Sequence, residues 1–352
     1  MQDEDASVDF NPTHRRHRLP YRAATVRERA YSPFHWSANP PMTTALLLDP
    51  VFKQHSPGPG HPECPERYDA VTVALSHHDD FPRIALRHAT PDEIALCHSR
   101  RYISTAEREI HDGIDELSTG DTHVCPRSYE VATQAVGSVL NAIDAVIDGE
   151  VNNAFCAVRP PGHHATPSRG MGFCVFNNVA IAARYAQREH GVERVMIADW
   201  DVHHGNGTQD IFYEDGSVFF FSTHQSPWYP GTGEESEHGK GQGEGTTLNL
   251  PFPSGSGRAE ILGGFQQRLL KAAADFRPDL VLISAGFDSR LGDPLGQFTL
   301  TDQDFYDLTN VMLEIADTHA NGRLVSLLEG GYSLSGLAAG VSSHVRALAG
   351  IK

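Results

Sequence analysis

Six short apolar runs recur along the chain, separated by segments with helical spacing or with turn residues. Apolar runs of this length are typical of buried strands, and strands that alternate with helices form a parallel sheet. No linker interrupts residues 42–352, so we expect one domain there. The predicted fold class is therefore α/β, a single-domain open parallel sheet with helices on both faces. The expected strands are 43–49, 154–158, 194–198, 218–222, 280–284 and 324–328.

Helices are expected where apolar residues recur every three to four positions. The clearest such segment is 126–149, and Gly191 is the kind of residue that ends a helix. Proline and glycine favour a loop of fixed shape at 53–66, and glycine favours a long loop at 223–245. The expected helices are 67–76, 92–110 with a break, 126–149 and 177–190.

Residues 1–41 lack apolar periodicity and contain five prolines, which is typical of a disordered leader. The leader carries six arginines and five acidic residues, a net charge of +1. Because the whole chain has a net charge of −17, residues 42–352 have a net charge of −18. We expect the folded domain at 42–352. No apolar run approaches membrane-spanning length, so no membrane association is expected.

The net charge of −17 argues against direct nucleic-acid binding, and an acidic surface suits cationic substrates or basic peptide tails. The five cysteines are odd in number and form no C-x-x-C pair, so neither a disulfide framework nor a thiolate zinc site is indicated. This cysteine usage predicts a reducing, cytoplasmic location.

The strand expected at 194–198 leads directly into a dense polar motif. Asp199, Asp201, His203 and His204 follow within six residues, and Gly205 then breaks the run. In an extended segment residues two apart point the same way, so Asp201 and His203 are expected to project together. Carboxylate and imidazole groups are ligands of first-row metals, and packing them at a strand end is costly unless something binds them. The motif therefore predicts a metal site.

Polar residues also follow the carboxyl ends of other expected strands. The carboxyl ends of parallel strands meet at one edge of an open sheet, and ligands of such sheets bind there. The sequence therefore predicts that these side chains meet in one site. They are His163 and His164, Asp201 and His203, Asp288, and Tyr332.

Seven motifs together closely resemble the zinc-dependent histone deacetylase family, most of all its class II branch and its bacterial relatives, which include acetylpolyamine amidohydrolases. The resemblance spans roughly residues 44–350. The motifs are His61–Arg67, Arg159–Ala165, Gly172–Cys174, Asp199–Gln209, Tyr229–Gly233, Ala285–Asp288 and Gly330–Tyr332.

This resemblance implies the arginase/deacetylase fold, with one catalytic Zn²⁺ at the bottom of a narrow tube. Asp201, His203 and Asp288 match the family's zinc ligands. His163 and His164 match its paired active-site histidines.

Further residues match the family's catalytic tyrosine, its acyl-lysine tunnel and its structural potassium site. Tyr332 is at the position of the catalytic tyrosine. Phe173 and Tyr229 fall at the two aromatic positions of the tunnel, beside Gly172 and Gly231. The rim position that holds the substrate backbone corresponds to Asp121, and Asp199 and Ser222 resemble groups around K⁺.

The resemblance also implies a mechanism. His164 takes a proton from water and returns it to the lysine nitrogen, while His163, bonded to Asp199, gives electrostatic support. Spacing alone leaves open which histidine is the general base. The partner of His164 matches Asn206, a neutral amide, which orients the ring without stabilising its cation. Tyr332 donates to the oxyanion.

The expected substrate is N-acetyl-lysine in proteins or peptides. An acetylpolyamine or another small N-acyl amide is the alternative. A polyamine-selective pocket needs a carboxylate at its rim, and polyamine-selective relatives can carry Glu within the Gly292–Gly296 segment. Leu295 at that position favours peptides, whereas Asp121 leaves polyamines open. A non-catalytic acetyl-lysine binder is a further alternative, but it would lack a metal ligand, an active-site histidine or the catalytic tyrosine. An arginase-type manganese enzyme would need a second set of metal ligands. Oligomeric state stays open.

Overall fold

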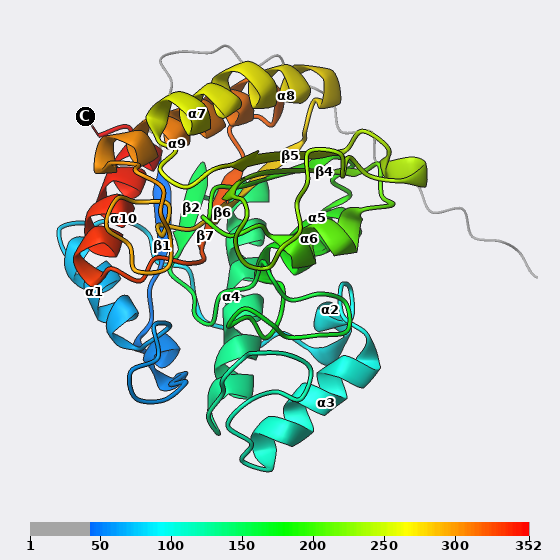
Figure 1. The fold of residues 1–352 in the computed structure, drawn as a ribbon, viewed down its shortest axis with the longest axis vertical. Helices are drawn as coiled ribbons and strands as arrows, with labels where there is room; N and C mark the ends of the chain where they lie inside the picture. Colours follow the sequence, from blue (N-terminus) through cyan, green and yellow to red (C-terminus); the bar gives the residue numbers. More distant parts are fainter. Residues whose placement is uncertain (1–42, 352) are drawn as a thin grey trace, which may run out of the picture. The chain divides into compact units, whose positions relative to one another are not determined.

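The computed structural model describes residues 43–351, and the leader expected at 1–41 lies outside the described residues. Within the described chain, one parallel sheet forms the centre and helices lie against it (Figure 1). No helix there is long and apolar enough to cross a membrane.

The sheet has seven strands in the order β1-β2-β7-β6-β3-β4-β5, and every neighbouring pair is parallel. Strand β3 lies between β6 and β4, and its last residue, Asp199, pairs with Ser284 on one side and Ser222 on the other. The predicted open parallel sheet is therefore confirmed. The strands are β1 Thr44–Leu47, β2 Asn153–Cys156, β3 Val195–Asp199, β4 Val218–Gln225, β5 Thr247–Phe252, β6 Leu280–Ala285 and β7 Leu324–Leu328.

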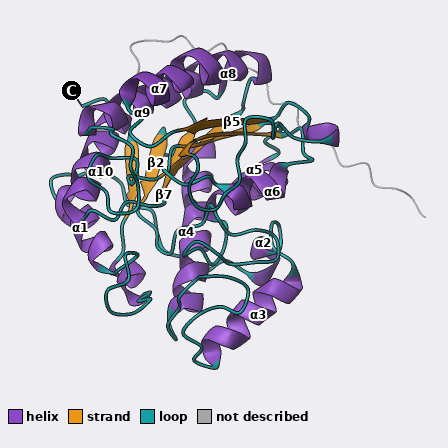
Figure 2. Cartoon of the chain, viewed as in Figure 1, coloured by secondary structure: helices purple, strands orange, loops and turns teal. Residues whose placement is uncertain are grey.

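Helices cover both faces of the sheet (Figure 2). On one face α4 packs on β1, β2 and β7, and α5 packs on β6; on the other α9 packs on β6 and α10 packs on β2. The α-helices are α1 Glu66–Ala74, α2 Pro91–Ile94, α3 Arg100–His111, α4 Ser128–Ile147, α5 Asn178–His190, α6 Asn206–Phe212, α7 Arg258–Gly264, α8 Leu270–Phe276, α9 Asp302–His319 and α10 Leu334–Leu348. Short 3-10 turns are η1 Pro50–Gln54 and η2 Gly241–Gly243, and a π-turn, η3 Phe265–Leu269, joins α7 to α8.

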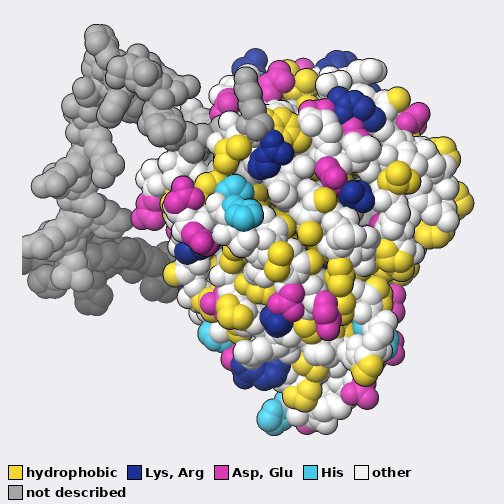
Figure 3. Space-filling model, turned by 90° about the vertical axis from the view of Figure 1, so that its left-hand side faces the viewer, with side chains coloured by type: hydrophobic (Ala, Val, Ile, Leu, Met, Phe, Trp, Pro, Cys, Tyr) yellow, Lys and Arg dark blue, Asp and Glu magenta, His cyan; other side chains and the backbone are white. Residues whose placement is uncertain are grey.

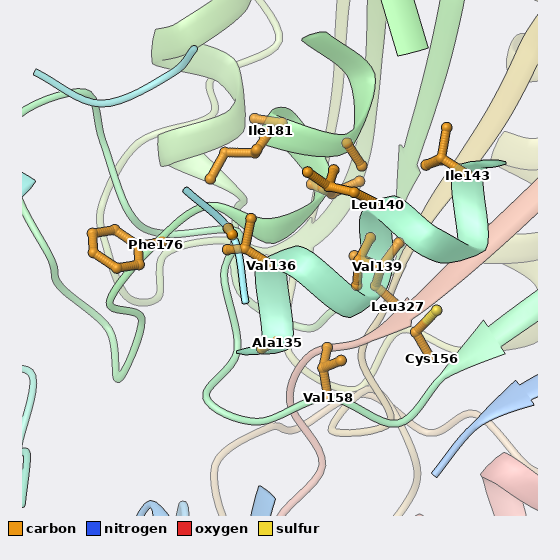
Figure 4. Close-up of a cluster of buried hydrophobic side chains, with 14 of the residues drawn as sticks. Ala135, Val136, Val139, Leu140, Ile143, Cys156, Val158, Phe176, Ile181 and Leu327 are labelled. Atoms are coloured by element: carbon orange, nitrogen blue, oxygen red, sulfur yellow. The ribbon is translucent and has the colours of Figure 1, made fainter. Parts of the chain in front are cut away.

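Two hydrophobic cores lie on opposite faces of the sheet, because successive residues of a buried strand point to opposite sides. In β3, Val195 and Ile197 belong to one core and Met196 and Ala198 to the other. Figure 4 shows the first core, where α4 meets the sheet. Its labelled residues include Val136, Val139, Leu140 and Ile143 of α4, Cys156 of β2 and Leu327 of β7. Burial on both faces explains why the strands read as continuous apolar runs.

Six of the seven strands lie where the apolar runs predicted them, and the four expected helices also form, within a few residues of the expected ends. The segment 92–110, predicted to be helical with a break, forms two helices, α2 and α3. Strand β5 was not predicted, and β4 extends to Gln225, into the segment expected to be a loop. Strand β5 reads Thr-Leu-Asn-Leu-Pro-Phe and lies at the sheet edge, where proline is tolerated and apolar continuity is not required.

The charged side chains on the face drawn in Figure 3 are scattered singly among uncharged ones. Several of the described acidic residues pair with a nearby base, as in Lys53–Asp69 and Arg184–Asp215. This face therefore presents no broad basic surface of the kind that binds nucleic acid.

Candidate active site

The polar residues that follow four different strands meet at the carboxyl edge of the sheet. His163 and His164 come after β2, Asp201 and His203 after β3, Asp288 after β6 and Tyr332 after β7. The predicted meeting point therefore forms, at the edge where parallel sheets hold ligands.

Three of these residues form a metal-binding triad. One ligand atom from each of Asp201, His203 and Asp288 lies within 4.8 Å of the other two. Nδ1 of His203 is 3.0 Å from Oδ1 of Asp201 and 3.2 Å from Oδ2 of Asp288. All three residues are buried, so their mutual repulsion and desolvation favour a bound cation.

The backbone around the triad is shaped to hold the carboxylates. The N–H of Gly330 donates to Oδ2 of Asp201 (2.8 Å), and the N–H of Val202 donates to Oδ1 of Asp288 (2.9 Å). A Cβ at Gly286 would lie 2.1 Å from Asp201 Oδ2, and one at Gly330 would lie 2.2 Å from Asp288 Oδ2. Glycine is therefore required at both positions, and the triad fits a single divalent metal with open positions.

The paired histidines lie beside the triad with ring centroids 4.0 Å apart. Nδ1 of His163 is 2.9 Å from Oδ2 of Asp199, and Nδ1 of His164 is 2.8 Å from Oδ1 of Asn206. Both rings are nearly fully buried, and Nε2 of His163 is 3.9 Å from Asp201 Oδ1. One imidazole thus faces carboxylates and the other a neutral amide.

This difference sends the two imidazole pKa values in opposite directions. Burial lowers the pKa of His163, but the charges of Asp199 and Asp201 outweigh it and raise that pKa to about 10. Burial lowers the pKa of His164 well below its usual value, and the neighbouring His163 and His203 lower it further. At neutral pH His163 therefore carries a positive charge and His164 is free to accept a proton.

A pocket of about 260 Å³ leads to His164, and its lining includes every residue predicted to bind substrate. Aromatic and apolar side chains dominate its wall, and one carboxylate lies at the rim. The lining residues are Asp121, His164, Gly172, Phe173, His203, Trp228, Tyr229, Leu295 and Tyr332.

Gly172 shapes the wall of the pocket through its contacts with His164 and Asp121. Gly172 has φ +57°, and a Cβ there would lie 2.3 Å from Cδ2 of His164. Its N–H donates to Oδ1 of Asp121 (2.7 Å), which also accepts from the hydroxyl of Tyr229 (3.3 Å). Asp121 therefore links Gly172 to Tyr229 across the pocket. Phe173, which follows Gly172 in the sequence, has φ 67°.

Tyr332 faces Phe173 across the pocket, with ring centroids 5.9 Å apart at 81°. Burial raises the pKa of its hydroxyl well above the usual value, against the opposing charge of Arg67. The hydroxyl is therefore protonated at neutral pH and can donate a hydrogen bond.

Arg67 holds the segment that carries Tyr332. Its guanidinium lies over the tyrosine ring, 4.9 Å from the centroid, and its Nε donates to the carbonyl of Gly331 (2.7 Å). Glu63 pairs with both Arg67 and Arg159 in a buried cluster. The sequence motif contains these residues, but its pattern did not indicate that they support the tyrosine.

Glu329 is a further supporting residue that the sequence pattern did not indicate. Its Oε2 accepts from the backbone N–H of Gly162 (2.6 Å) and of His163 (3.2 Å), and Oε1 accepts from Ser284 Oγ (3.1 Å). Burial raises the pKa of Glu329 to about 7, against the charge of His163. The available signal was an acidic residue directly after an apolar strand.

Asp199, the last residue of β3, pairs with Ser222 inside β4. Oδ1 of Asp199 accepts from the N–H of Asp201 (3.1 Å), and the hydroxyl of Ser222 lies 2.9 Å from Nδ1 of His224. Nδ1 of His204 lies 2.8 Å from the hydroxyl of Thr232. These groups form a polar layer behind the triad.

The site combines a buried triad of possible metal ligands, two histidines whose pKa values shift in opposite directions, and a protonated tyrosine at the end of a pocket. This combination defines a candidate metal-dependent hydrolase site. A family model described as "histone deacetylase domain" matches residues 61–348. The chain therefore belongs to the histone deacetylase family, as its motifs predicted.

Individual relatives agree with this assignment. Histone deacetylase 14, chloroplastic, of Arabidopsis thaliana is 41% identical over 309 residues, which cover 82% of this chain and 73% of that protein. A mouse protein named as a polyamine deacetylase is 40% identical over 305 residues, covering 82% of this chain and 45% of the relative. The crystal structure of the HDA15 HD domain superposes with a TM-score of 0.83 at 34% identity, covering 88% of this chain and 90% of that one. The chain is a hydrolytic deacetylase with the fold of this family.

Proposed function

We propose that this chain is a zinc-dependent amidohydrolase that removes acetyl groups from Nε-acetyl-lysine of proteins or peptides. The observation that carries the proposal is one narrow pocket that ends at His164, His203 and Tyr332. An acyl-lysine side chain suits such a pocket, because the apolar walls bury its methylene groups and the polar groups lie mainly at the inner end of the pocket.

Two carboxylates and one imidazole are groups that bind Zn²⁺, the resemblance to a zinc-dependent family favours that ion, and three protein ligands leave positions open. Asp201, His203 and Asp288 would hold the ion. Zinc, when bound, supplies Lewis-acid polarisation of the amide carbonyl and lowers the pKa of water.

The remaining steps use residues of this chain. The Nδ1–H of His164 donates to Asn206, which leaves Nε2 as the acceptor for a proton of the attacking water. The water oxygen bonds to the acetyl carbon, the C–N bond breaks, and His164 returns the proton to the leaving lysine nitrogen. Acetate and a free amine result.

His163 and Tyr332 stabilise the charge that develops during this reaction. His163 is cationic because of Asp199 and Asp201, so it favours negative charge nearby. The protonated hydroxyl of Tyr332 donates to the oxyanion that forms on the carbonyl oxygen. We also propose a structural K⁺ near Asp199 and Ser222, on the basis of family resemblance.

The mouth of the pocket favours a peptide over a free polyamine. Leu295 and Trp228 make one side of it apolar, while Asp121 uses an oxygen to hold Gly172 and Tyr229. Acetylpolyamine remains the second candidate, because Asp121 is a carboxylate at the rim and one similar protein is named a polyamine deacetylase.

The test compares hydrolysis of an acetyl-lysine peptide and of N-acetylputrescine by zinc-loaded protein, with Tyr332→Phe as the control. We expect faster turnover of the peptide and collapse of that rate in the variant. A preference for N-acetylputrescine would move the assignment to polyamines. No turnover of either substrate by metal-replete protein would contradict the proposal.

A cytoplasmic location is a further proposal, supported by five free cysteines. Cell fractionation or imaging of the tagged chain tests it. Chloroplastic relatives make a plastid-like compartment the alternative outcome.

A further inference from the structure

Asp293 lies next to the active site but does not line its pocket. It is buried, with 8% of its surface exposed. Its Oδ2 accepts from the backbone N–H of Tyr332 (2.7 Å) and of Ser333 (2.9 Å), and its Oδ1 accepts from the N–H of Leu295 (2.9 Å). One carboxylate therefore joins the segment that carries the tyrosine to the segment that forms the pocket mouth.

The link continues to the surface of the pocket. The indole N–H of Trp228 donates to the carbonyl of Leu295 (2.9 Å), and both side chains line the pocket mouth. On the opposite side of the tyrosine segment, Arg67 holds the carbonyl of Gly331. The backbone of Tyr332 is thus held from both sides, by Asp293 at its N–H and by Arg67 at the preceding carbonyl.

Only a carboxylate fits this arrangement. Three N–H donors converge on two oxygens, so both side-chain oxygens must be acceptors. An asparagine has one acceptor oxygen, and its NH₂ group would face a backbone N–H on the other side. Whichever way the amide turned, the link to Leu295 or the link to Tyr332 and Ser333 would be lost.

We propose that Asp293 is a positioning residue that holds the Tyr332 hydroxyl where the oxyanion forms and ties it to the pocket mouth at Leu295. This inference rests on the proposed function of the site. A donor contributes to rate only when it is aimed at the position of the oxyanion, so loss of positioning lowers kcat more than it weakens substrate binding.

The first experiment is a double-mutant cycle with Asp293→Asn and Tyr332→Phe in the full chain, using whichever acetyl substrate the wild type hydrolyses. Alone, Asp293→Asn is expected to lower kcat by about 10- to 100-fold, with KM changed less than about threefold. In the Tyr332→Phe background the same change is expected to cost less than about threefold, because the hydroxyl to be positioned is gone.

The second experiment does not depend on turnover. Amide hydrogen exchange is measured by mass spectrometry on a peptide that covers residues 330–335. We expect exchange there to be several-fold faster in Asp293→Asn, since two of its N–H groups lose their acceptor or gain mobility. Asp144→Asn is the matched control, a carboxylate of α4 that accepts from Tyr185 and His190 on the α5 side.

The outcomes separate the two hypotheses. No turnover by the wild type contradicts the proposed function. Losses that multiply in the double mutant, or unchanged exchange at 330–335, overturn the positioning role of Asp293. If Asp293→Asn does not fold, Asp293→Glu replaces it in both experiments, because it keeps two acceptor oxygens but moves them by one methylene. It must then reproduce both the non-additive loss and the faster exchange.

Discussion

Oδ1 of Asn206 lies 2.8 Å from Nδ1 of His164, so the histidine at the end of the pocket is oriented by a neutral amide. The adjacent His163 is instead paired with the carboxylate of Asp199 at 2.9 Å. The Nδ1 atoms of the two neighbouring rings are therefore held by partners of different charge, and the pKa values of the rings shift in opposite directions.

Asn206→Asp is expected to raise the pKa of His164, because a carboxylate stabilises the imidazolium. His164 must be neutral to accept a proton, so the acidic limb of the kcat/KM profile should move to higher pH by about 1 to 3 units. The pH dependence of kcat/KM measures this shift. An unchanged or downward-shifted acidic limb would argue against His164 as the base.

Tyr332→Phe is expected to lower kcat by about 10²- to 10³-fold, because it removes the oxyanion donor. KM should change little, since the ring that contacts Phe173 and Arg67 remains. Steady-state kinetics with matched metal content provide the check. A variant that retained most of its kcat would exclude the proposed role.

Zinc affinity is expected to increase with pH. Burial lowers the pKa of His203, but hydrogen bonds to Asp201 and Asp288 outweigh this and raise it to about 10, so a metal must displace a proton from this ring. Competition titrations with a chelator at about pH 6 and about pH 8 should show affinity rising by up to about tenfold per pH unit. Affinity independent of pH would contradict this linkage.

The raised pKa of His203 also predicts how the stability of the metal-free protein depends on pH. A raised folded-state pKa contributes stability that is full below the unfolded value of about 6.5 and is lost as the pH rises toward about 10. The gain in melting temperature from added zinc should therefore be larger at about pH 8 than at about pH 6. Equal gains, measured by calorimetry, would count against it.

Leu295→Glu is expected to shift selectivity toward acetylpolyamines. The new carboxylate would join Asp121 at the pocket mouth and attract the free ammonium group of N-acetylputrescine. The ratio of kcat/KM for N-acetylputrescine to that for the peptide should rise by about tenfold or more at low salt and less at high salt. Leu295→Gln, of similar size but neutral, is the control and should leave the ratio nearly unchanged.

Local pattern alone predicted much of this protein. Six strands were readable because both of their faces are buried, which leaves continuous apolar runs in the sequence. The meeting of Asp201, His203 and Asp288 was predictable for a related reason, since the strands that precede them end at one edge of the sheet; the resemblance to the family identified these three as the metal ligands. Strand β5 escaped detection because Asn249 and Pro251 interrupt its apolar character at the sheet edge.

The supporting residues were decided only by the tertiary structure. Glu329 bonds to His163 across 166 positions of sequence, and Asp293 bonds to Tyr332 across 39. Both accept from backbone N–H groups, which every residue except proline carries and which therefore leave no mark in the sequence. Hydrogen bonds depend on distance and direction, so the sequence determined which strands and ligands could meet, and only folding determined which carboxylates would hold them in position.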